Sequence, residues 1–417
     1  MVALSVDGKP GRYFNLKKIK KLSLILICIL LVSVIPFVFG QEQTEWTFIF
    51  YLDADNNLGV YAEEDLAEML NVGVLSNVNV VVLYDTFEGP VHAYLVQDGN
   101  LVLLDEFSLD GDEVDMGDPY TVKTFLDYVM YNYEASRYFL TIWDHGDDFR
   151  GSCRDEHTNN PEEERGFLYH SELQPILKDK DIDILAFDAC IQGMIEVAYY
   201  YKDTADILIG SEDYVSYHGF PYDKILEKME ASPDISNDEL AEYVADKYVG
   251  AYIKENGRGG GGYVEAFPTL SVIKLEKVDN IIASLNELTI GLVDNVKDYH
   301  GLITSARAKS IMAMPMFGWD ADIDLYTFAE KIRNSVPDEE ISDKANSLME
   351  TIDEAVYMNC SYQLSRMLAH GLGIFFPSSS GSINHNPWLY GEYYQNSVSF
   401  AQETEWLSFL LEYYEMK

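Results

Sequence analysis

Short apolar runs alternate with longer amphipathic stretches along the first half of the chain. The apolar runs are rich in β-branched and aromatic residues, as is typical of strands that are buried on both faces. They cover residues 46–52, 78–84, 138–143, 182–187 and 206–210. Helical periodicity occupies stretches between them, at 60–70, 119–133 and 192–201. This alternation predicts a parallel sheet with helices on both of its faces.

The remaining elements complete the expected architecture. Strands at 91–96 and 101–107 flank Asp98-Gly99-Asn100, which is typical of a hairpin turn. The second half is more helical, with helices expected at 238–254, 276–299, 325–335 and 338–358 and one late strand at 371–377. We therefore predict an α/β protein, a three-layer α/β/α sandwich with a mainly parallel sheet. Its core is expected over 41–223, and a helical C-terminal part over 224–417 is expected to pack on that core.

The first 40 residues have the pattern of a secretory signal peptide. Six basic residues and one acid precede an uncharged apolar run over 22–39, and Gly40 fits a cleavage site. An uncleaved membrane anchor is the alternative, because about 20 apolar residues span a bilayer. Either interpretation predicts a secreted or surface-exposed protein, with no membrane contact if the segment is removed.

The charge of the chain restricts its partners. The 70 acidic and 29 basic residues give a net charge of −41. This charge excludes nucleic acid binding through a basic surface and favours cationic peptides and metal ions. Solubility in a salty or acidic habitat would explain the same composition. We expect a monomer.

Candidate catalytic residues follow the predicted strands, at the sheet edge where ligands bind in parallel sheets. His145-Gly146 follows the strand over 138–143, and Cys190 follows the strand over 182–187. A thiol and an imidazole are the minimum for nucleophilic acyl transfer. The helix expected after Cys190 would lower the pKa of its thiol. A buried core cysteine and a structural histidine are the alternatives.

Carboxylates at the same edge allow two further interpretations. Asp188 lies two residues before Cys190, on the same face if the strand persists, where it suits a pocket for Lys or Arg. A helix cap is the alternative for Asp188. Asp53 and Asp55 follow the first strand as a D-x-D pair, which is typical of phosphohydrolases with an aspartyl nucleophile. An Asp pair at a strand end also serves turns and caps.

Several of these motifs together resemble the clostripain family of cysteine peptidases, which have a caspase-like fold. The matching segments include YLDADNNL at 51–58, YFLTIWDHG at 138–146, ILAFDACIQGMIEVAY at 184–199, SEDYVSYHGFPYD at 211–223 and GLGIFFP at 371–377. The resemblance implies that His145 is the catalytic base, Cys190 the nucleophile and Asp188 the acid of a pocket for basic side chains. Asp147, Asp148 and Phe149 depart from the small residues and Trp that often follow the His-Gly in this family.

The predicted activity is hydrolysis of peptide bonds after Arg or Lys. The backbone N–H groups of Gly146 and Cys190 are expected to hold the oxyanion. An exported binding module on an inactive peptidase scaffold is the alternative. The polar segment 147–166 shows no strand or helix period, so it is expected to be an exposed loop open to self-cleavage. Arg154 and Arg165 are favoured over Arg150 as cleavage sites.

No cofactor is predicted to be required. The resemblance implies Ca²⁺ weakly, and closely spaced acids look like ligands, namely Asp110, Asp112, Asp115 and Asp118. They lack the 12-residue calcium loop, so solvated loop acids are the alternative. Outside the signal segment the cysteines are Cys153, Cys190 and Cys360. This odd number leaves at least one free thiol, and pairing of Cys153 with Cys360 stays open.

Overall fold

The structure is a computed structural model that describes residues 44–87, 89–109, 114–157, 166–252, 268–311, 321–361, 369–378 and 391–416. The predicted signal segment 1–40 lies outside these residues. The part from Thr44 onward forms one compact unit. None of the helices described is long and apolar enough to cross a membrane.

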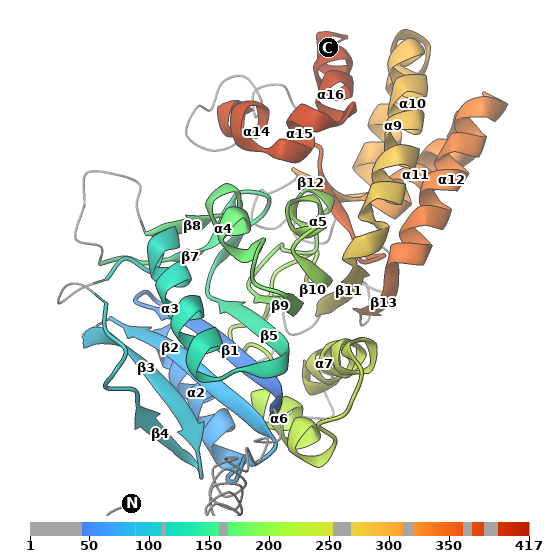
Figure 1. Cartoon of the computed structure of the whole chain (residues 1–417). Helices are drawn as coiled ribbons and strands as arrows, with labels where there is room; N and C mark the ends of the chain where they lie inside the picture. Colours follow the sequence, from blue (N-terminus) through green and yellow to red (C-terminus); the bar gives the residue numbers. More distant parts are fainter. Residues whose placement is uncertain are drawn as a thin grey trace, which may run out of the picture. The chain divides into compact units, whose positions relative to one another are not determined.

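A nine-stranded sheet runs through this unit (Figure 1). Its middle consists of five parallel strands, which are, in spatial order, β10 (Ala205–Gly210), β9 (Ile182–Asp188), β5 (Ala135–Trp143), β1 (Thr44–Ala54) and β2 (Val78–Thr86). Antiparallel strands extend both edges, with β3 (Gly89–Gln97) and β4 (Asn100–Leu103) beside β2 and with β11 (Thr269–Lys274) and β13 (Val356–Ser361) beside β10. The five buried strands predicted from the sequence are confirmed, and so is the hairpin, although its second strand ends at Leu103 and not at Phe107.

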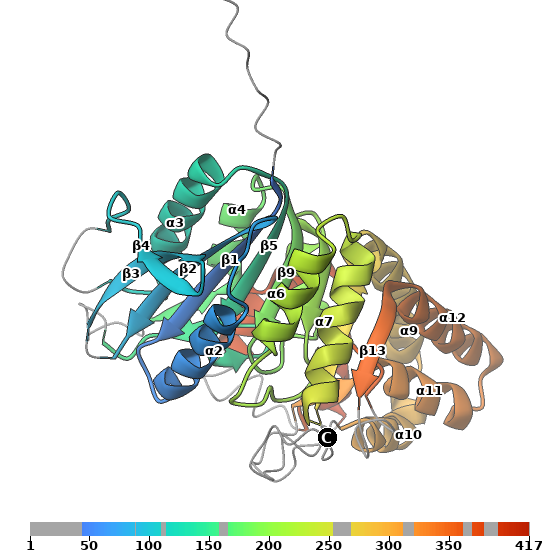
Figure 2. The same ribbon diagram turned by 90° about the horizontal axis from the view of Figure 1, so that it is seen from below.

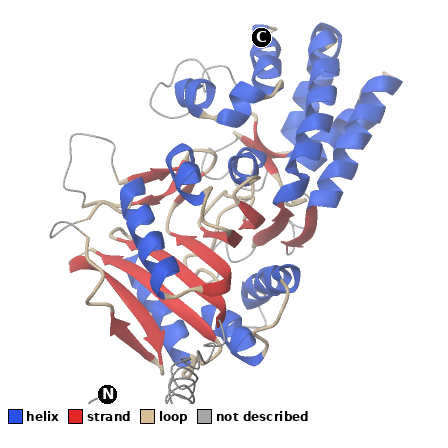
Figure 3. Cartoon of the chain, viewed as in Figure 1, coloured by secondary structure: helices blue, strands red, loops and turns tan. Residues whose placement is uncertain are grey.

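Helices cover both faces of the sheet, as Figures 2 and 3 show. One face packs against α2 (Gly59–Asn71), α6 (Tyr222–Ala231) and α7 (Asn237–Tyr252). The other packs against α3 (Pro119–Asn132), α4 (His170–Leu177) and α5 (Ile195–Tyr201). Helix α3 begins where Asp118 accepts a hydrogen bond from the N–H of Tyr120 and Pro119 occupies the first turn. The predicted three-layer α/β/α architecture is therefore confirmed.

The C-terminal half adds further helices to the second face. They are α9 (Val278–Asp294), α10 (Val296–Lys309), α11 (Leu325–Ser335), α12 (Glu339–Ala355), α14 (Gly391–Ser397), α15 (Ser399–Glu403) and α16 (Trp406–Glu415), with a 3₁₀ turn, η1, at Leu275–Lys277. The single helix predicted over 276–299 is in fact two, because the backbone leaves helical geometry at Asn295. The side chain of Asn295 donates to the carbonyl of Gly291 and so caps the end of α9.

Two other predictions about this half need correction. The helix predicted over 338–358 ends at Ala355. Residues 356–358 instead begin the edge strand β13. The late strand predicted over 371–377 is shorter, since β14 covers Gly373–Phe375. It pairs with β12 (Asp322–Asp324) in a separate two-stranded sheet and does not join the main sheet.

The prediction that 147–166 is one exposed loop is wrong for its first part. A small sheet forms there from β6 (Gly146–Asp147), β7 (Gly151–Arg154) and β8 (Phe167–Tyr169). Phe149 is fully buried, with its ring 4.8 Å from those of Phe375 and Tyr394. The segment is polar overall, but its buried apolar side chains, such as Phe149, pack it against the core. Residues 158–165 lie outside the described part.

Candidate active site

The sheet brings His145 and Cys190 to the same edge. Strands β5 and β9 are parallel neighbours, and Trp143 at the end of β5 pairs with Asp188 at the end of β9. His145 follows β5 by two residues and Cys190 follows β9 by two residues, so both leave adjacent strand ends. Both side chains line one small pocket of about 40 Å³. This arrangement matches the juxtaposition expected from the strand order.

The thiol of Cys190 is partly buried, in surroundings that disfavour the thiolate. Burial raises the pKa of this thiol to about 12, and the charge of Asp213 adds to the increase, although the N–H of Val215 opposes it. That N–H points at Sγ across 3.4 Å. The predicted lowering of the pKa by a helix N-terminus is wrong, because α5 begins only at Ile195. The thiol therefore needs a base to become a nucleophile.

The turn after Cys190 explains why the helix starts late. Ile191 has a φ of +56°, in the left-handed region that β-branched residues rarely adopt. Its N–H donates to the carbonyl of Asp213, 3.0 Å away. This strained turn holds Cys190 between the end of β9 and the start of α5. Strain of this kind is common at functional sites.

The imidazole of His145 is half-buried and suited to accept a proton. Its Nε2 lies 3.0 Å from Oδ1 of Asn57. An amide oxygen only accepts hydrogen bonds, so Nε2 carries the proton and Nδ1 is left as the basic nitrogen. Burial lowers the pKa of His145, and the charge of Arg154 lowers it further. No local pattern in the sequence indicates this contact, which joins residues 88 positions apart.

Asp188 forms part of the wall of the same pocket and is 4% exposed. Its Oδ2 accepts hydrogen bonds from the N–H of Phe220 and the hydroxyl of Tyr222, each at 2.7 Å. Phe220 lies just before α6 and Tyr222 is the first residue of α6, so the carboxylate does not cap the helix after Cys190. Asp188 is placed where the side chain of a bound substrate could reach it.

Asp53 and Asp55 are unsuited to nucleophilic attack. They are 0% and 1% exposed. Burial, together with the charge of Asp144, raises the pKa of Asp53 well above its ordinary value. A protonated, buried carboxyl is a poor nucleophile, so the phosphohydrolase interpretation has no support in this geometry.

A group of three buried carboxylates is the place where a cation would fit. Asp55, Asp85 and Asp155 offer ligand atoms that all lie within 4.8 Å of one another. Carboxylate oxygens are the ligands that Ca²⁺ prefers, and Oδ2 of Asp55 is buried without a hydrogen-bond partner. A calcium ion held there would tie the residues after β7 to the ends of β1 and β2.

Two of the four acids predicted as possible calcium ligands make hydrogen bonds within the backbone turns around them. Asp115 accepts the N–H of Gly117 in a turn, and Asp118 caps α3. Asp110 and Asp112 lie outside the described residues. A calcium requirement stays a prediction.

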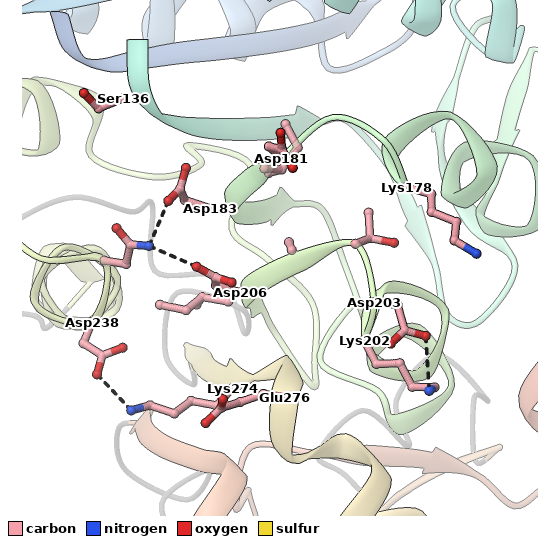
Figure 4. Close-up of a pocket in the computed structure, with 15 residues that line it drawn as sticks. Ser136, Lys178, Asp181, Asp183, Lys202, Asp203, Asp206, Asp238, Lys274 and Glu276 are labelled. Carbon is pink, nitrogen blue, oxygen red and sulfur yellow. Dashed lines mark hydrogen bonds and ion pairs between the residues drawn. The ribbon is translucent and has the colours of Figure 1, made fainter. Parts of the chain in front are cut away.

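A wider cleft of about 680 Å³ lies at the opposite edge of the sheet (Figure 4). It is formed around the amino ends of β9 and β10, and its charges are largely used within the protein. Lys274 pairs with Asp238 at 2.8 Å, and the amide of Asn237 lies between the carboxylates of Asp183 and Asp206. Its lining residues include neither a thiol nor an imidazole, so the chemistry belongs to the smaller pocket.

The predicted self-cleavage sites differ in their settings. Arg154 is the last residue of β7, its N–H donates to the carboxylate of Asp144, and its carbonyl accepts from Nδ2 of Asn56. A peptide bond must enter an active site to be cleaved, and these backbone hydrogen bonds of Arg154 would first have to break. They therefore do not support cleavage after Arg154. Arg165 lies outside the described residues. Cys153 and Cys360, whose pairing was open, are both free thiols.

A thiol and an imidazole at adjacent strand ends of such an α/β/α sandwich are typical of cysteine peptidases with a caspase-like fold. The model of the clostripain family matches residues 50–414 of the chain. The chain therefore belongs to the clostripain family and is a cysteine-type endopeptidase. This membership sets aside both the phosphohydrolase and the inactive binding module.

Individual relatives agree with this assignment. The chain is 27% identical over 408 residues to clostripain from Hathewaya histolytica, with 81% of this chain and 76% of that protein covered. A secreted cysteine protease from Bacteroides thetaiotaomicron in complex with an irreversible peptide inhibitor has a TM-score of 0.65 at 19% identity, covering 87% of this chain and 99% of that one. An inactive zymogen from Parabacteroides distasonis has a TM-score of 0.60 at 18% identity, covering 87% and 98%. At these identities the two structures establish the fold alone.

Proposed function

We propose that the chain is a secreted endopeptidase that cleaves after basic residues, with Cys190 as nucleophile and His145 as general base. The single observation that carries this proposal is that His145, Cys190 and Asp188 line one pocket at the carboxyl ends of β5 and β9. Secretion is supported by the pattern of residues 1–40. The structural relative from Bacteroides thetaiotaomicron, described as secreted, agrees with it.

The chemistry starts from a neutral pair, since the pKa of Cys190 is raised and that of His145 is lowered. As a substrate carbonyl approaches, the proton of the thiol passes to His145 and Sγ bonds to the carbonyl carbon. The backbone N–H groups of Gly146 and Cys190 are proposed to stabilise the oxyanion. His145 then gives the proton to the leaving amine, and water releases the acyl group in a second cycle of the same steps.

The proposed substrate class follows from the charge of the pocket. Asp188 places a carboxylate in the wall of this pocket, and a cationic side chain that enters the pocket would gain a charge-assisted contact with it. The net charge of −41 would also attract cationic peptides at low ionic strength. Arg or Lys is therefore the proposed residue before the scissile bond, the P1 residue.

The test is a set of matched peptides that differ only at P1, assayed with the parent protein and with Cys190→Ala. We expect cleavage after Arg or Lys by the parent and a loss of about 10³-fold or more in Cys190→Ala. Asp188→Asn should reduce cleavage after basic residues far more than cleavage after Leu. Equal cleavage after Leu and Arg by the parent would contradict the proposed specificity, and an active Cys190→Ala protein would contradict the proposed nucleophile.

A further inference from the structure

Two stacked tyrosines, Tyr61 and Tyr217, stand at the border of the proposed catalytic pocket. Tyr217 lines this pocket together with His145 and Cys190, and it belongs to the loop between β10 and α6. Its ring packs on that of Tyr61 in α2, with the centroids 5.4 Å apart and the planes inclined by 17°. Tyr217 is nonetheless 55% exposed. A large ring that is supported by a neighbour and open to solvent beside the proposed nucleophile is a candidate surface for a substrate side chain.

The turn that carries Tyr217 is fixed by hydrogen bonds. The N–H of Gly219 donates to the carbonyl of Ser216 at 2.9 Å, so Tyr217 and His218 are the two central residues of the turn. The hydroxyl of Tyr252 in α7 donates to the carbonyl of Gly219 at 2.6 Å and anchors the turn from behind. A substrate would therefore meet the ring of Tyr217 without first having to order this loop.

Contacts with α2 hold the same turn from a second side. Nδ1 of His218 lies 2.9 Å from Oε2 of Glu64, and the imidazole of His218 meets the ring of Tyr61 edge-on at 5.3 Å. Helix α2 begins two residues after Asn57, whose side-chain oxygen contacts Nε2 of His145. One short segment, 57–64, thus holds both the imidazole of the proposed catalytic pair and the ring that supports Tyr217.

The strand order indicates which part of a substrate would pass Tyr217. Strands β10, β9 and β5 are neighbours in that order, so Cys190 stands between the loop after β10 and His145. In the proposed mechanism His145 gives its proton to the leaving amine, so the residues after the scissile bond lie on the side of His145. The residues before that bond therefore pass the loop after β10. The first of them beyond P1 is the P2 residue.

We propose that Tyr217 is a specificity-determining residue that selects an aromatic side chain at P2. This inference rests on the proposed function, to which it adds a second requirement on the substrate. An aromatic P2 side chain would stack on the ring of Tyr217 and remove apolar surface of both rings from water, whereas a small P2 side chain would leave the ring of Tyr217 exposed. Tyr61 acts as a positioning residue that holds the ring of Tyr217 in place.

Four variants distinguish this role from a structural one. Tyr217→Ala removes the ring, and Tyr217→Phe keeps the ring and removes only the hydroxyl. Tyr61→Ala removes the support beneath the ring. Tyr131→Ala is the matched control, because Tyr131 is an 86% exposed tyrosine of α3, which packs on the opposite face of the sheet from α2.

The test measures kcat/KM for three peptides that all carry Arg at P1. One has Phe at P2, one has Ala at P2, and one has Ala at P2 with Phe at P1′, the residue after the scissile bond. The parent should prefer Phe over Ala at P2 by about tenfold. This ratio should fall to about twofold or less in Tyr217→Ala, decrease in Tyr61→Ala, and stay at the parent value in Tyr217→Phe and Tyr131→Ala.

Three results would overturn the proposal. They are the absence of a P2 preference in the parent, an unchanged P2 ratio in Tyr217→Ala, and a preference for Phe that is confined to P1′. If Tyr217→Ala does not fold, competitive inhibition of the parent replaces it: acetyl-Phe-Arg-amide should bind about tenfold more tightly than acetyl-Ala-Arg-amide, and equal binding would overturn the proposal. A parent that cleaves none of the three peptides after Arg would instead contradict the proposed function, so the two failures are distinguishable.

Discussion

Gly146 packs directly against the backbone of Cys190. A Cβ built on Gly146 would lie 2.1 Å from the carbonyl oxygen of Cys190 and 2.7 Å from its nitrogen. The segment after β5 and the segment after β9 therefore touch at main-chain level, beside the imidazole and the thiol. Only glycine allows this approach, and the contact fixes the distance between the two halves of the proposed catalytic pair.

Gly146→Ala should consequently inactivate the enzyme. The methyl group has to displace the backbone of Cys190, and a shift of about 1 Å at a reacting group can cost about 10²-fold in rate. We expect at least that loss in kcat/KM. Gly301→Ala is the matched control, because a Cβ there meets nothing within 4 Å and the residue lies inside α10. Full activity of Gly146→Ala would show that the contact does not set the site.

Asn57 should matter through the imidazole. Asn57→Ala removes the acceptor at Nε2 of His145, so the ring loses the bond that fixes its tautomer. The expected loss in kcat is about tenfold, the rate equivalent of one hydrogen bond. Steady-state kinetics of Asn57→Ala, measured together with those of His145→Ala, test this expected loss in kcat. The kcat of Asn57→Gln shows whether a longer amide side chain restores the contact with His145. Unchanged kcat in Asn57→Ala would mean that the contact is incidental.

Stability should fall as the pH rises toward neutrality. Burial raises the pKa of Glu196 to about 7 from its ordinary value of 4.5. The folded state therefore holds this proton more tightly than the unfolded state does. The contribution of the Glu196 carboxyl group to the free energy of unfolding is complete below pH 4.5 and is lost as the pH rises through about 7.

Glu196→Gln keeps an acceptor for the N–H of Phe375 and the hydroxyl of Tyr394 and removes the titration. The melting temperature of the parent should thus decline between pH 5 and pH 8 more steeply than that of Glu196→Gln. Glu63→Gln, which removes an exposed acid, should follow the parent. Identical pH dependence in the parent and Glu196→Gln would contradict this assignment.

Self-processing, if it accompanies activity, should occur after Arg165. Arg154 is fixed in β7 by backbone hydrogen bonds, whereas Arg165 stands in the polar sequence between β7 and β8. Mass spectrometry of the purified protein should find a new N-terminus at Gly166 that is absent from Cys190→Ala and from Arg165→Gln. Cleavage after Arg154, or cleavage in Cys190→Ala, would contradict the prediction.

Much of the fold and the core of the site follow from the sequence for a simple reason. Strands β1, β5 and β9 are continuous apolar runs, and a parallel sheet brings whatever follows them to one edge. The placement of His145, Cys190 and Asp188 at one edge of the sheet was predictable in this way. Strand β7 was not, because Cys153 has a φ of +60° and the register shifts between Ser152 and Arg154, which breaks the alternation of a regular strand.

Contacts made by tertiary packing were also beyond the sequence. Asn57 meets His145 and Asp65 meets Trp143 across 88 and 78 positions, and no local pattern encodes such pairs. The direction of the pKa shift at Cys190 was also beyond the sequence, because burial of the thiol raises its pKa and the left-handed turn at Ile191 separates it from the first turn of α5. The helical periodicity of the preceding sequence runs on into β13. This strand lies at the edge of the sheet and is half-buried along its whole length, so its sequence shows no clear strand alternation.

The central claim is that Cys190 is the nucleophile beside a pocket for basic side chains. It is tested most directly by treating the parent protein with thiol-directed peptidyl ketones that carry Arg or Leu at P1, and by mapping the adduct by mass spectrometry. The account predicts a single adduct on Cys190, none on Cys153 or Cys360, and faster labelling by the Arg reagent by about 10²-fold or more. Labelling of another cysteine, or equal rates with the two reagents, would contradict it.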